Sequence, residues 1–235
     1  DLDPKLAQRM IYGKWIELTT EVIYYEYDPA QNYRDTAYEI DRRFPIWLSF
    51  DFNIGLGKPL SAVLMQYIGD AFHVFAEVVV EGLRTQDALE ELAERGHLDY
   101  GVKYLVAGDA TGKRRDTRSK RSDWDIIQKF LANYKSAKTK RLDFDLRVGV
   151  SNPRIRDRHN TVNAYCHNSE GKRRFFVYKS APTAHKGMRL TKLKPGSHMI
   201  EDDSPDYQHI TTAIGYAVCE QVNSVRRKKQ GTVQL

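Results

Sequence analysis

Cysteine and long apolar runs are scarce in this chain of 235 residues. Its two cysteines, Cys166 and Cys219, are too few for a disulfide framework, and no Cys or His spacing suggests a zinc site. No apolar run approaches the roughly 20 residues needed to span a bilayer, and the first ten residues lack the order of a signal peptide. We therefore expect a protein of a reducing cytoplasm with no membrane contact.

The motifs of nucleotide-driven motors and of common hydrolases are also absent. A phosphate-binding loop needs Gly, four residues, Gly-Lys and then Ser or Thr, whereas residues 108–114 have one residue too few and end in Arg. Residues 55–59 are no closer, and no G-x-S-x-G nucleophile elbow occurs. The sequence therefore encodes no ATPase motor.

The composition is that of a folded protein. Hydrophobic residues make up 41% and charged residues 29%, and 14 tyrosines with nine phenylalanines suffice for a core. The length suits one large domain better than two.

Basic residues are unevenly distributed. The net charge is +6 and the isoelectric point is about 9.1, and residues 113–121 hold six basic residues in nine. Further basic runs occupy 172–174, 186–194 and 226–229. One such run would be an ordinary solvated loop or tail, but four favour a polyanionic partner such as DNA.

Apolar periodicity and turn residues predict an α/β domain with a mixed sheet flanked by helices. The predicted strands are 20–29, 46–53, 60–68, 72–80, 102–109, 142–150 and 173–180. The predicted helices are 85–96, 122–134, 155–166 and 205–222, the first with Thr85 as N-cap, and residues 181–203 are predicted to be a loop.

Acidic residues lie at the ends of three of these elements. Asp51 ends the first alternating strand, Asp109 ends the buried run 102–109, and Asp206 opens the last helix with His209 one turn later. Each alone would suit a turn or a helix cap. Together, converging carboxylates need a cation to neutralise them, and their oxygens suit Mg²⁺ or Mn²⁺.

Several segments match one known family in order along the whole chain. LDPKLAQRMIYGKWIE, WLSFDFNIG, LVAGDATGKRRDTRSKRSDWDIIQKFL, NPRIRDRHNTVNAYC and DDSPDYQHITTAIGYA together resemble the C-terminal nuclease domain of tailed-bacteriophage terminase large subunits. The resemblance implies a ribonuclease H-like fold and a metal-dependent endonuclease that cuts double-stranded DNA with little sequence preference during viral genome packaging. It also implies that the protein acts in the cytoplasm of the infected bacterial host.

By position in these motifs, Asp51 and Asp109 are expected to be ligands of two Mg²⁺ or Mn²⁺ ions. The third motif departs from the family pattern, in which a histidine or aspartate precedes an aspartate by three residues. Here the corresponding residues are His209 and Thr212, and threonine is a poor metal ligand. We assign the missing role to Asp206 with His209, which would ligate metal or orient water.

Two acids are held in reserve as ligands, Asp203 in the preceding loop and Glu77 in the third alternating strand. Asp123 and Asp125 suit a helix start better than a metal site. The predicted DNA contacts are the basic residues that follow Asp109, namely Lys113, Arg114, Arg115, Arg118, Lys120 and Arg121.

The resemblance divides the chain into three parts. Residues 1–45 would be a connecting segment from an ATPase domain that is not in this sequence, 46–222 the nuclease domain, and 223–235 a basic tail. Expected partners are DNA, the ATPase domain, the portal protein and the small terminase subunit. Two alternatives stay open: a junction-resolving or repair nuclease of the same fold, and a catalytically weak DNA-binding or docking module.

Overall fold

A computed structural model gives the arrangement of most of the chain. The residues that it describes are 2–4, 22–52, 59–80, 84–113, 121–135, 141–194 and 205–231. No helix within these ranges is long and apolar enough to cross a membrane.

A seven-stranded mixed sheet forms the centre of the molecule, in the order β1-β7-β4-β3-β2-β5-β6. Strand β2 pairs antiparallel with β3 and parallel with β5, so parallel and antiparallel ladders meet at β2. The strands are β1 (Tyr33–Arg34), β2 (Ile46–Asp51), β3 (Leu60–Ile68), β4 (Ala71–Val80), β5 (Tyr104–Gly108), β6 (Phe144–Leu146) and β7 (Phe175–Tyr178).

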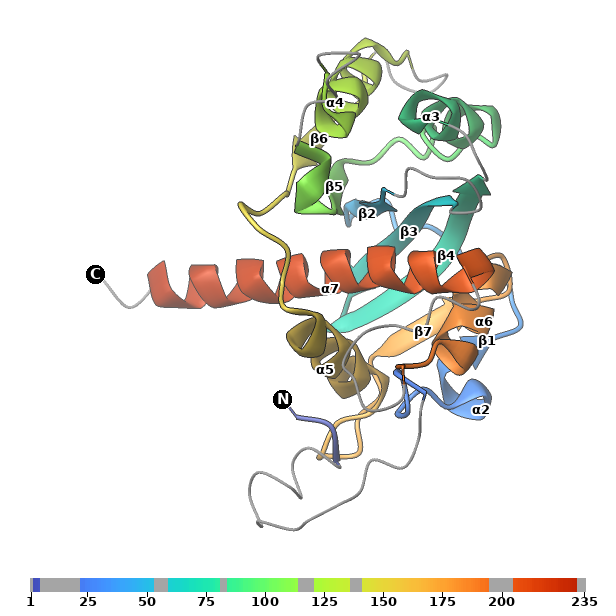
Figure 1. Cartoon of the computed structure of the whole chain (residues 1–235), viewed down its shortest axis with the longest axis vertical. Helices are drawn as coiled ribbons and strands as arrows, with labels where there is room; N and C mark the ends of the chain where they lie inside the picture. Colours follow the sequence, from blue (N-terminus) through green and yellow to red (C-terminus); the bar gives the residue numbers. More distant parts are fainter. Residues whose placement is uncertain are drawn as a thin grey trace.

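Helices cover both faces of this sheet (Figure 1). One face packs against α5, α6 and the long α7, and the other packs against α3 and α4. The helices are α2 (Pro29–Asn32), α3 (Thr85–Glu94), α4 (Asp123–Asn133), α5 (Ile155–Cys166), α6 (Pro182–Leu190) and α7 (Pro205–Gly231), with a 3-10 turn η1 (Ala110–Lys113).

The alternation within β2 decides which side chains meet α7. Ile46, Leu48 and Phe50 enter the core beneath α3 and α4, whereas Trp47 enters the core beneath α5, α6 and α7. Because side chains alternate along a strand, Asp51 lies on the same face as Trp47. All six residues of β2 are buried, as expected for a strand covered on both faces.

Turn and cap residues agree with most predicted boundaries. Gly69 and Asp70 both have positive φ (57° and 66°) and close the hairpin between β3 and β4, which correspond to the predicted strands 60–68 and 72–80. Ser122 and Asp125 form a capping box at the start of α4, which agrees with the predicted helix 122–134. Helix α3 differs by one residue, because its N-cap is Arg84 and Thr85 is the first helical residue.

Two predicted elements are wrong. The described part of the predicted strand 20–29 forms turns that bury Ile23 and Tyr24 in the α7 core. The predicted loop 181–203 contains α6, whose Ala184 and Met188 are fully buried. The strand predicted over 142–150 is also shorter than expected, since β6 spans only Phe144–Leu146.

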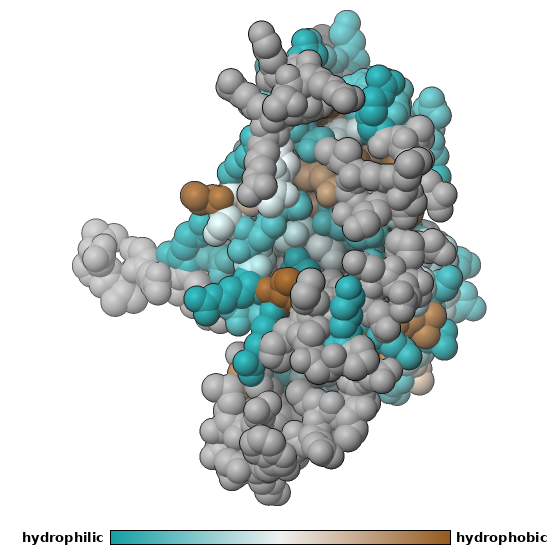
Figure 2. Space-filling view, viewed as in Figure 1, coloured by the Kyte–Doolittle hydropathy of each residue, from teal (hydrophilic) through white to brown (hydrophobic). Residues whose placement is uncertain are grey.

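The N-terminal part of the described chain packs against this body, and the C-terminal helix extends from it. The Tyr24 hydroxyl donates a hydrogen bond to the carbonyl of Thr211 in α7 (3.3 Å), and β1 pairs with β7. Helix α7 continues to Gly231 and projects beyond the sheet (Figure 1). Among the coloured residues in Figure 2, most are hydrophilic and the apolar ones form a few separate spots.

Candidate active site

Asp51 and Asp109 lie at the carboxyl ends of two neighbouring parallel strands. Phe50 of β2 is in register with Gly108 of β5, and each aspartate is the next residue along its strand. The amide of Asp109 donates a hydrogen bond to the carbonyl of Phe50 (3.1 Å). Only 5% of Asp51 and 9% of Asp109 is exposed, so the fold places two carboxylates together in a poorly hydrated position.

Glycine at position 108 makes this close approach possible. Its φ is +150°, and a Cβ there would lie 2.4 Å from the carbonyl oxygen of Phe50. A side chain would therefore force the two strands apart just before their aspartates.

Hydrogen bonds fix the Asp109 carboxylate. Its Oδ1 accepts from the Asn152 side-chain amide (2.7 Å) and from the amide of Thr111 (2.7 Å). The indole of Trp124 donates to the Asp109 carbonyl (2.9 Å). Neither Asn152 nor Trp124 was predicted as a site residue, and the only signal at Asn152 is that it precedes a proline.

His209 joins Asp51 from the facing helix. Its Nδ1 lies 3.0 Å from Asp51 Oδ2, and 8% of the histidine is exposed. Helix α7 is fixed against β2 by the Ser49 hydroxyl, which donates to the carbonyl of Ala213 (2.7 Å). Thr212, one helical turn after His209, is also buried. The structure therefore brings together two of the predicted site residues, Asp51 and His209.

A buried tyrosine and arginine lie beside this group. Burial raises the pKa of Tyr216, Asp51 and Asp109 raise that pKa further, and Arg158 lowers it. The Arg158 guanidinium carbon lies 4.9 Å from the centre of the Tyr216 ring. Both acids and this cation therefore act on one hydroxyl group.

The remaining predicted ligands are placed less fully. The backbone of Asp206 lies in the first turn of α7, but its side chain is outside the described part, as is all of Asp203. Glu77 accepts from the amides of Thr183 and Ala184 (2.7 Å each) and so caps α6. Among the described residues, no group of three or more His, Cys, Asp or Glu side chains is placed to hold a metal.

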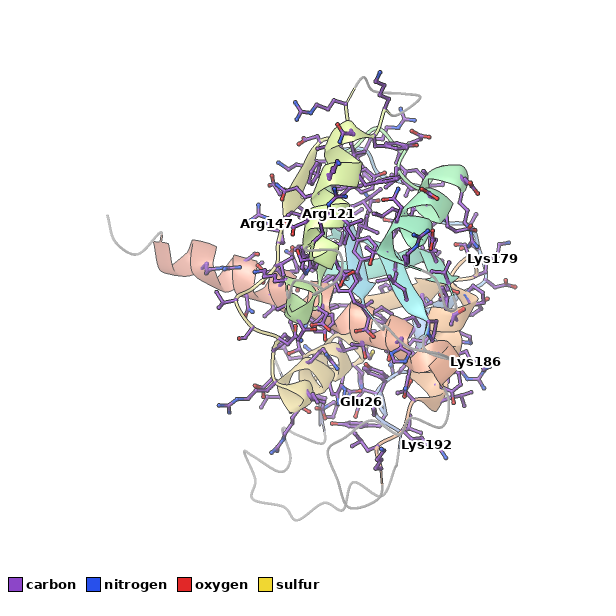
Figure 3. All side chains as sticks on the ribbon, turned by 45° about the horizontal axis from the view of Figure 1, so that its top comes forward. Glu26, Arg121, Arg147, Lys179, Lys186 and Lys192 are labelled. Atoms are coloured by element: carbon purple, nitrogen blue, oxygen red, sulfur yellow. The ribbon has the colours of Figure 1, made fainter. Side chains whose placement is uncertain are left out.

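Only part of the predicted DNA-contact run lies in the described ranges. The Lys113 ammonium donates to the carbonyls of Val148 (3.2 Å) and Gly149 (2.7 Å), which ties η1 to the segment before α5. Arg121 is exposed next to α4, at a distance from Lys186 and Lys192 (Figure 3). Arg114, Arg115, Arg118 and Lys120 fall outside the described residues.

Two other charged groups are engaged in structural contacts. Arg174 pairs with Asp70 (2.6 Å), so the basic run 172–174 is not simply a solvated loop. Asp125 accepts from the amide of Ser122 (2.9 Å) and Asp123 accepts from the Thr85 hydroxyl. The interpretation of Asp123 and Asp125 as residues of a helix start is confirmed.

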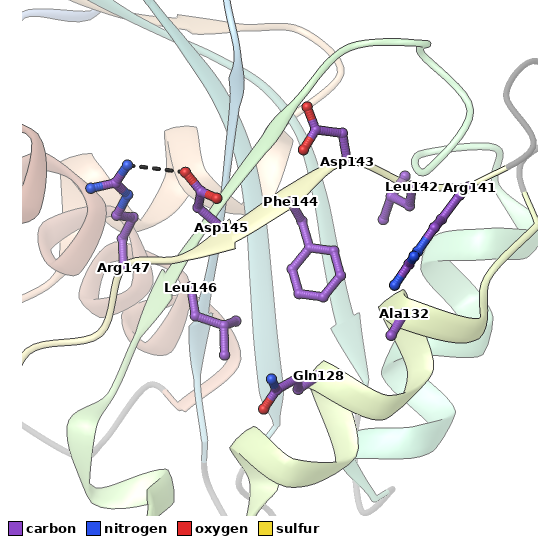
Figure 4. A pocket seen from close by; sticks show the side chains of 9 residues that line it. All are labelled: Gln128, Ala132, Arg141, Leu142, Asp143, Phe144, Asp145, Leu146 and Arg147. Carbon is purple, nitrogen blue, oxygen red and sulfur yellow. Dashed lines mark hydrogen bonds and ion pairs between the residues drawn. The ribbon is translucent and has the colours of Figure 1, made fainter.

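An open groove lies along the β6 edge of the sheet (Figure 4), and neither Asp51 nor Asp109 is among the residues that line it. It combines arginines and aspartates, and Arg147 pairs with Asp145 (3.1 Å). Its mixed charge does not indicate a polyanion, so Asp51 and Asp109 remain the candidate active site.

Comparison with known proteins places this fold. No protein-family model and no curated protein matches the sequence. Among solved structures, the nuclease domain of the P22 large terminase matches with a TM-score of 0.55 and 13% identity, over 82% of this chain and 91% of that domain. The chain has the fold of a large terminase nuclease domain. The predicted ribonuclease H-like mixed sheet flanked by helices is confirmed.

Two further phage structures agree. The large terminase nuclease of the thermophilic phage G20c matches with a TM-score of 0.53 and 6% identity, over 84% of this chain and 97% of that one. The large terminase of another thermophilic bacteriophage matches with a TM-score of 0.55 and 11% identity, over 84% of this chain. This chain spans only 44% of the length of that large terminase. At these identities the likeness shows the fold alone.

Proposed function

We propose that this chain is a metal-dependent endonuclease that hydrolyses phosphodiester bonds in double-stranded DNA with little sequence preference. The observation that carries the proposal is the buried pair Asp51 and Asp109 at the ends of paired parallel strands, with His209 hydrogen-bonded to Asp51. A shared fold with terminase nuclease domains supports it.

The donor atoms at this site fit a divalent cation. Carboxylate oxygens suit Mg²⁺ and Mn²⁺, and Mg²⁺ is commonly held by one or two protein carboxylates, with water and substrate phosphate as its other ligands. Asp51 and Asp109 would hold the first ion, and Asp206, with Asp203 in reserve, would help to hold a second. Bound there, such ions would activate water and stabilise the leaving oxygen.

The chain's own residues orient this site. His209 holds the carboxylate of Asp51, while Asn152 and the amide of Thr111 hold that of Asp109. The basic run after Asp109 would hold DNA phosphates. Such contacts fix the position of the duplex without distinguishing bases, which suits an enzyme that must cut at any sequence.

The biological role that we infer is cleavage during viral genome packaging in the cytoplasm of an infected bacterium. The partners would be DNA, a terminase ATPase domain, the portal protein and the small terminase subunit. This inference rests on the fold and on the family motifs of the sequence.

Plasmid cleavage by the purified chain tests the activity, with Mg²⁺, Mn²⁺ or EDTA. We expect metal-dependent cutting that falls about 10²-fold or more in both Asp51→Asn and Asp109→Asn, because each variant removes a carboxylate charge that would hold the metal ion at the reacting phosphate. Asp143→Asn is the matched control, since that side chain is 70% exposed beside β6 and should cut normally.

Two results would contradict the proposal. One is full activity in the Asp51→Asn or Asp109→Asn variant, and the other is no cutting with any metal by a folded chain that binds DNA. A marked preference for four-way junctions over linear duplex would instead favour the resolving nuclease.

A further inference from the structure

Arg158, in the first turn of α5, is a buried cation. Only 4% of the residue is exposed. Its aliphatic stem lies against α7, where a Cβ on Gly215 would fall 2.5 Å from Arg158 Cγ and 2.6 Å from Cδ. Its guanidinium lies over the ring of Tyr216. The contact with Gly215 therefore fixes where this charge sits.

No carboxylate of the described chain pairs with this cation. Arg158 takes part in no ion pair within the described ranges, and its buried Nε has no hydrogen-bond partner there. The cation–π contact with Tyr216 is a weak substitute for an anion. A buried guanidinium without an anionic partner is unfavourable, so the arrangement is what a binding site for an anion requires.

Arg158 lies in the same part of the fold as Asp51 and Asp109. Asn152, whose amide holds Asp109, lies shortly before α5, so the chain passes directly from that contact to Arg158. Arg158 packs against Gly215 of α7, two residues after Ala213, whose carbonyl accepts a hydrogen bond from Ser49, the residue two positions before Asp51 in β2. The guanidinium and the carboxylate pair therefore belong to one region, although they form no ion pair with each other in the described structure.

We propose that Arg158 binds a non-bridging oxygen of the DNA phosphate that is cleaved at Asp51 and Asp109. The guanidinium offers planar N–H groups that match phosphate oxygens, and the buried setting strengthens the attraction as negative charge develops on the phosphate. This assignment rests on the proposed nuclease function and adds a substrate-binding residue to it. The phosphate supplies the anion that the described part of the protein does not.

The test uses the full chain with Arg158→Met and Arg158→Lys. Methionine keeps much of the stem and removes the charge, so the variant should fold, and we expect kcat for plasmid cutting to fall about 10²-fold. Lysine should recover only part of that loss, because an ammonium cannot form the planar two-point contact. Arg156→Met is the matched control, since Arg156 is exposed on the same helix and should cut within a few-fold of the wild type.

The outcomes separate this assignment from the nuclease proposal. If the wild type cuts and Arg158→Met cuts equally well, or if Arg156→Met is impaired to the same degree, Arg158 does not bind the phosphate, whereas the nuclease function stands. If Arg158→Met unfolds, Arg158→Lys decides: wild-type kcat in that folded variant would make Arg158 a stabilising residue and overturn the assignment.

If the wild type does not cut with any metal, the nuclease function fails and DNA binding decides about Arg158. Fluorescence anisotropy with a short duplex in EDTA would then be measured as a function of salt. Weaker binding by Arg158→Met than by Arg156→Met, with a salt slope lower by about one, supports the phosphate contact. Equal binding by the two variants overturns it.

Discussion

The substitution Gly108→Ala tests whether the close approach of β2 and β5 builds the active site. The added Cβ would meet the carbonyl oxygen of Phe50 at 2.4 Å, and its other near neighbours are also backbone atoms of Phe50. No side-chain rotation can relieve this contact. The strands must separate, and Asp109 moves with β5 relative to Asp51.

The expected loss has three parts. The backbone conformation at φ +150° costs an alanine about 1–3 kcal/mol, and the hydrogen bond from the Asp109 amide to Phe50, if lost, costs about 1 kcal/mol more. The steric contact adds to both, so we expect the free energy of unfolding to fall by about 3–5 kcal/mol. A displacement approaching 1 Å at the carboxylates would lower the cutting rate by about 10²-fold.

Urea unfolding and plasmid cleavage measure these two effects. Gly101→Ala is the control, because Gly101 also has a positive φ (73°) but no atom lies within 4 Å of a Cβ there. It should lose only about 1–2 kcal/mol of strain and cut normally. If Gly108→Ala loses no more stability than Gly101→Ala, or cuts at the wild-type rate, the role given to this contact is wrong.

Two further variants probe the surroundings of the site. Asn152→Ala removes the hydrogen bonds to Asp109 and to the amide of Ala110. We therefore expect the free energy of unfolding in urea to fall by about 1–3 kcal/mol and the cutting rate to fall about 10–100-fold. An unchanged cutting rate would show that Asn152 does not orient the Asp109 carboxylate. Burial lowers the pKa of His159 to about 3, so the unfolded chain binds a proton that the folded chain does not between pH 6.5 and 3. Stability should therefore be unaffected by His159 above pH 6.5 and fall by about 1.4 kcal/mol per pH unit within that window. Urea titrations at pH 4.5, 5.5 and 7.5 should show that the free energy of unfolding falls less steeply with decreasing pH in His159→Phe than in the wild type. Equal pH slopes in the two proteins would refute this role of His159.

The sheet was predictable because its signal is local. The alternation in 46–53 and the turn Gly69-Asp70 specify strands regardless of what packs on them. What the sequence did not reveal about β2 is that both of its faces are covered. That fact depends on helices far along the chain.

The two wrong elements depend on tertiary contacts. Helix α6 begins at Pro182 in a segment rich in Lys and Gly, but Glu77 caps its first amides and the core buries Met188. Neither contact is visible within the segment itself. Conversely, residues 23–26 form turns although they favour strands, because burial of Ile23 and Tyr24 in the core beneath α5, α6 and α7 outweighs their strand propensity.

The candidate active site divides in the same way. Asp51, Asp109 and His209 were predicted as site residues because each occupies the end or the first turns of an element, a position that spacing reveals. Asn152 and Arg158 were not, because an asparagine before a proline and an arginine among other arginines have no distinguishing pattern. Only the fold shows that one holds Asp109 and the other is buried against Gly215.

Thr212 and Arg158 change the charge balance of the site in the same direction. A threonine stands in the turn after His209, where the resemblance to terminase nucleases predicts a carboxylate, and Arg158 adds a buried positive charge nearby. Fewer carboxylates mean less mutual repulsion for a metal to neutralise, and therefore weaker metal binding before DNA arrives. The DNA phosphate would bring a negative charge, which Thr212 does not provide and which Arg158 lacks as a partner. Metal binding and substrate binding should therefore favour each other at this site.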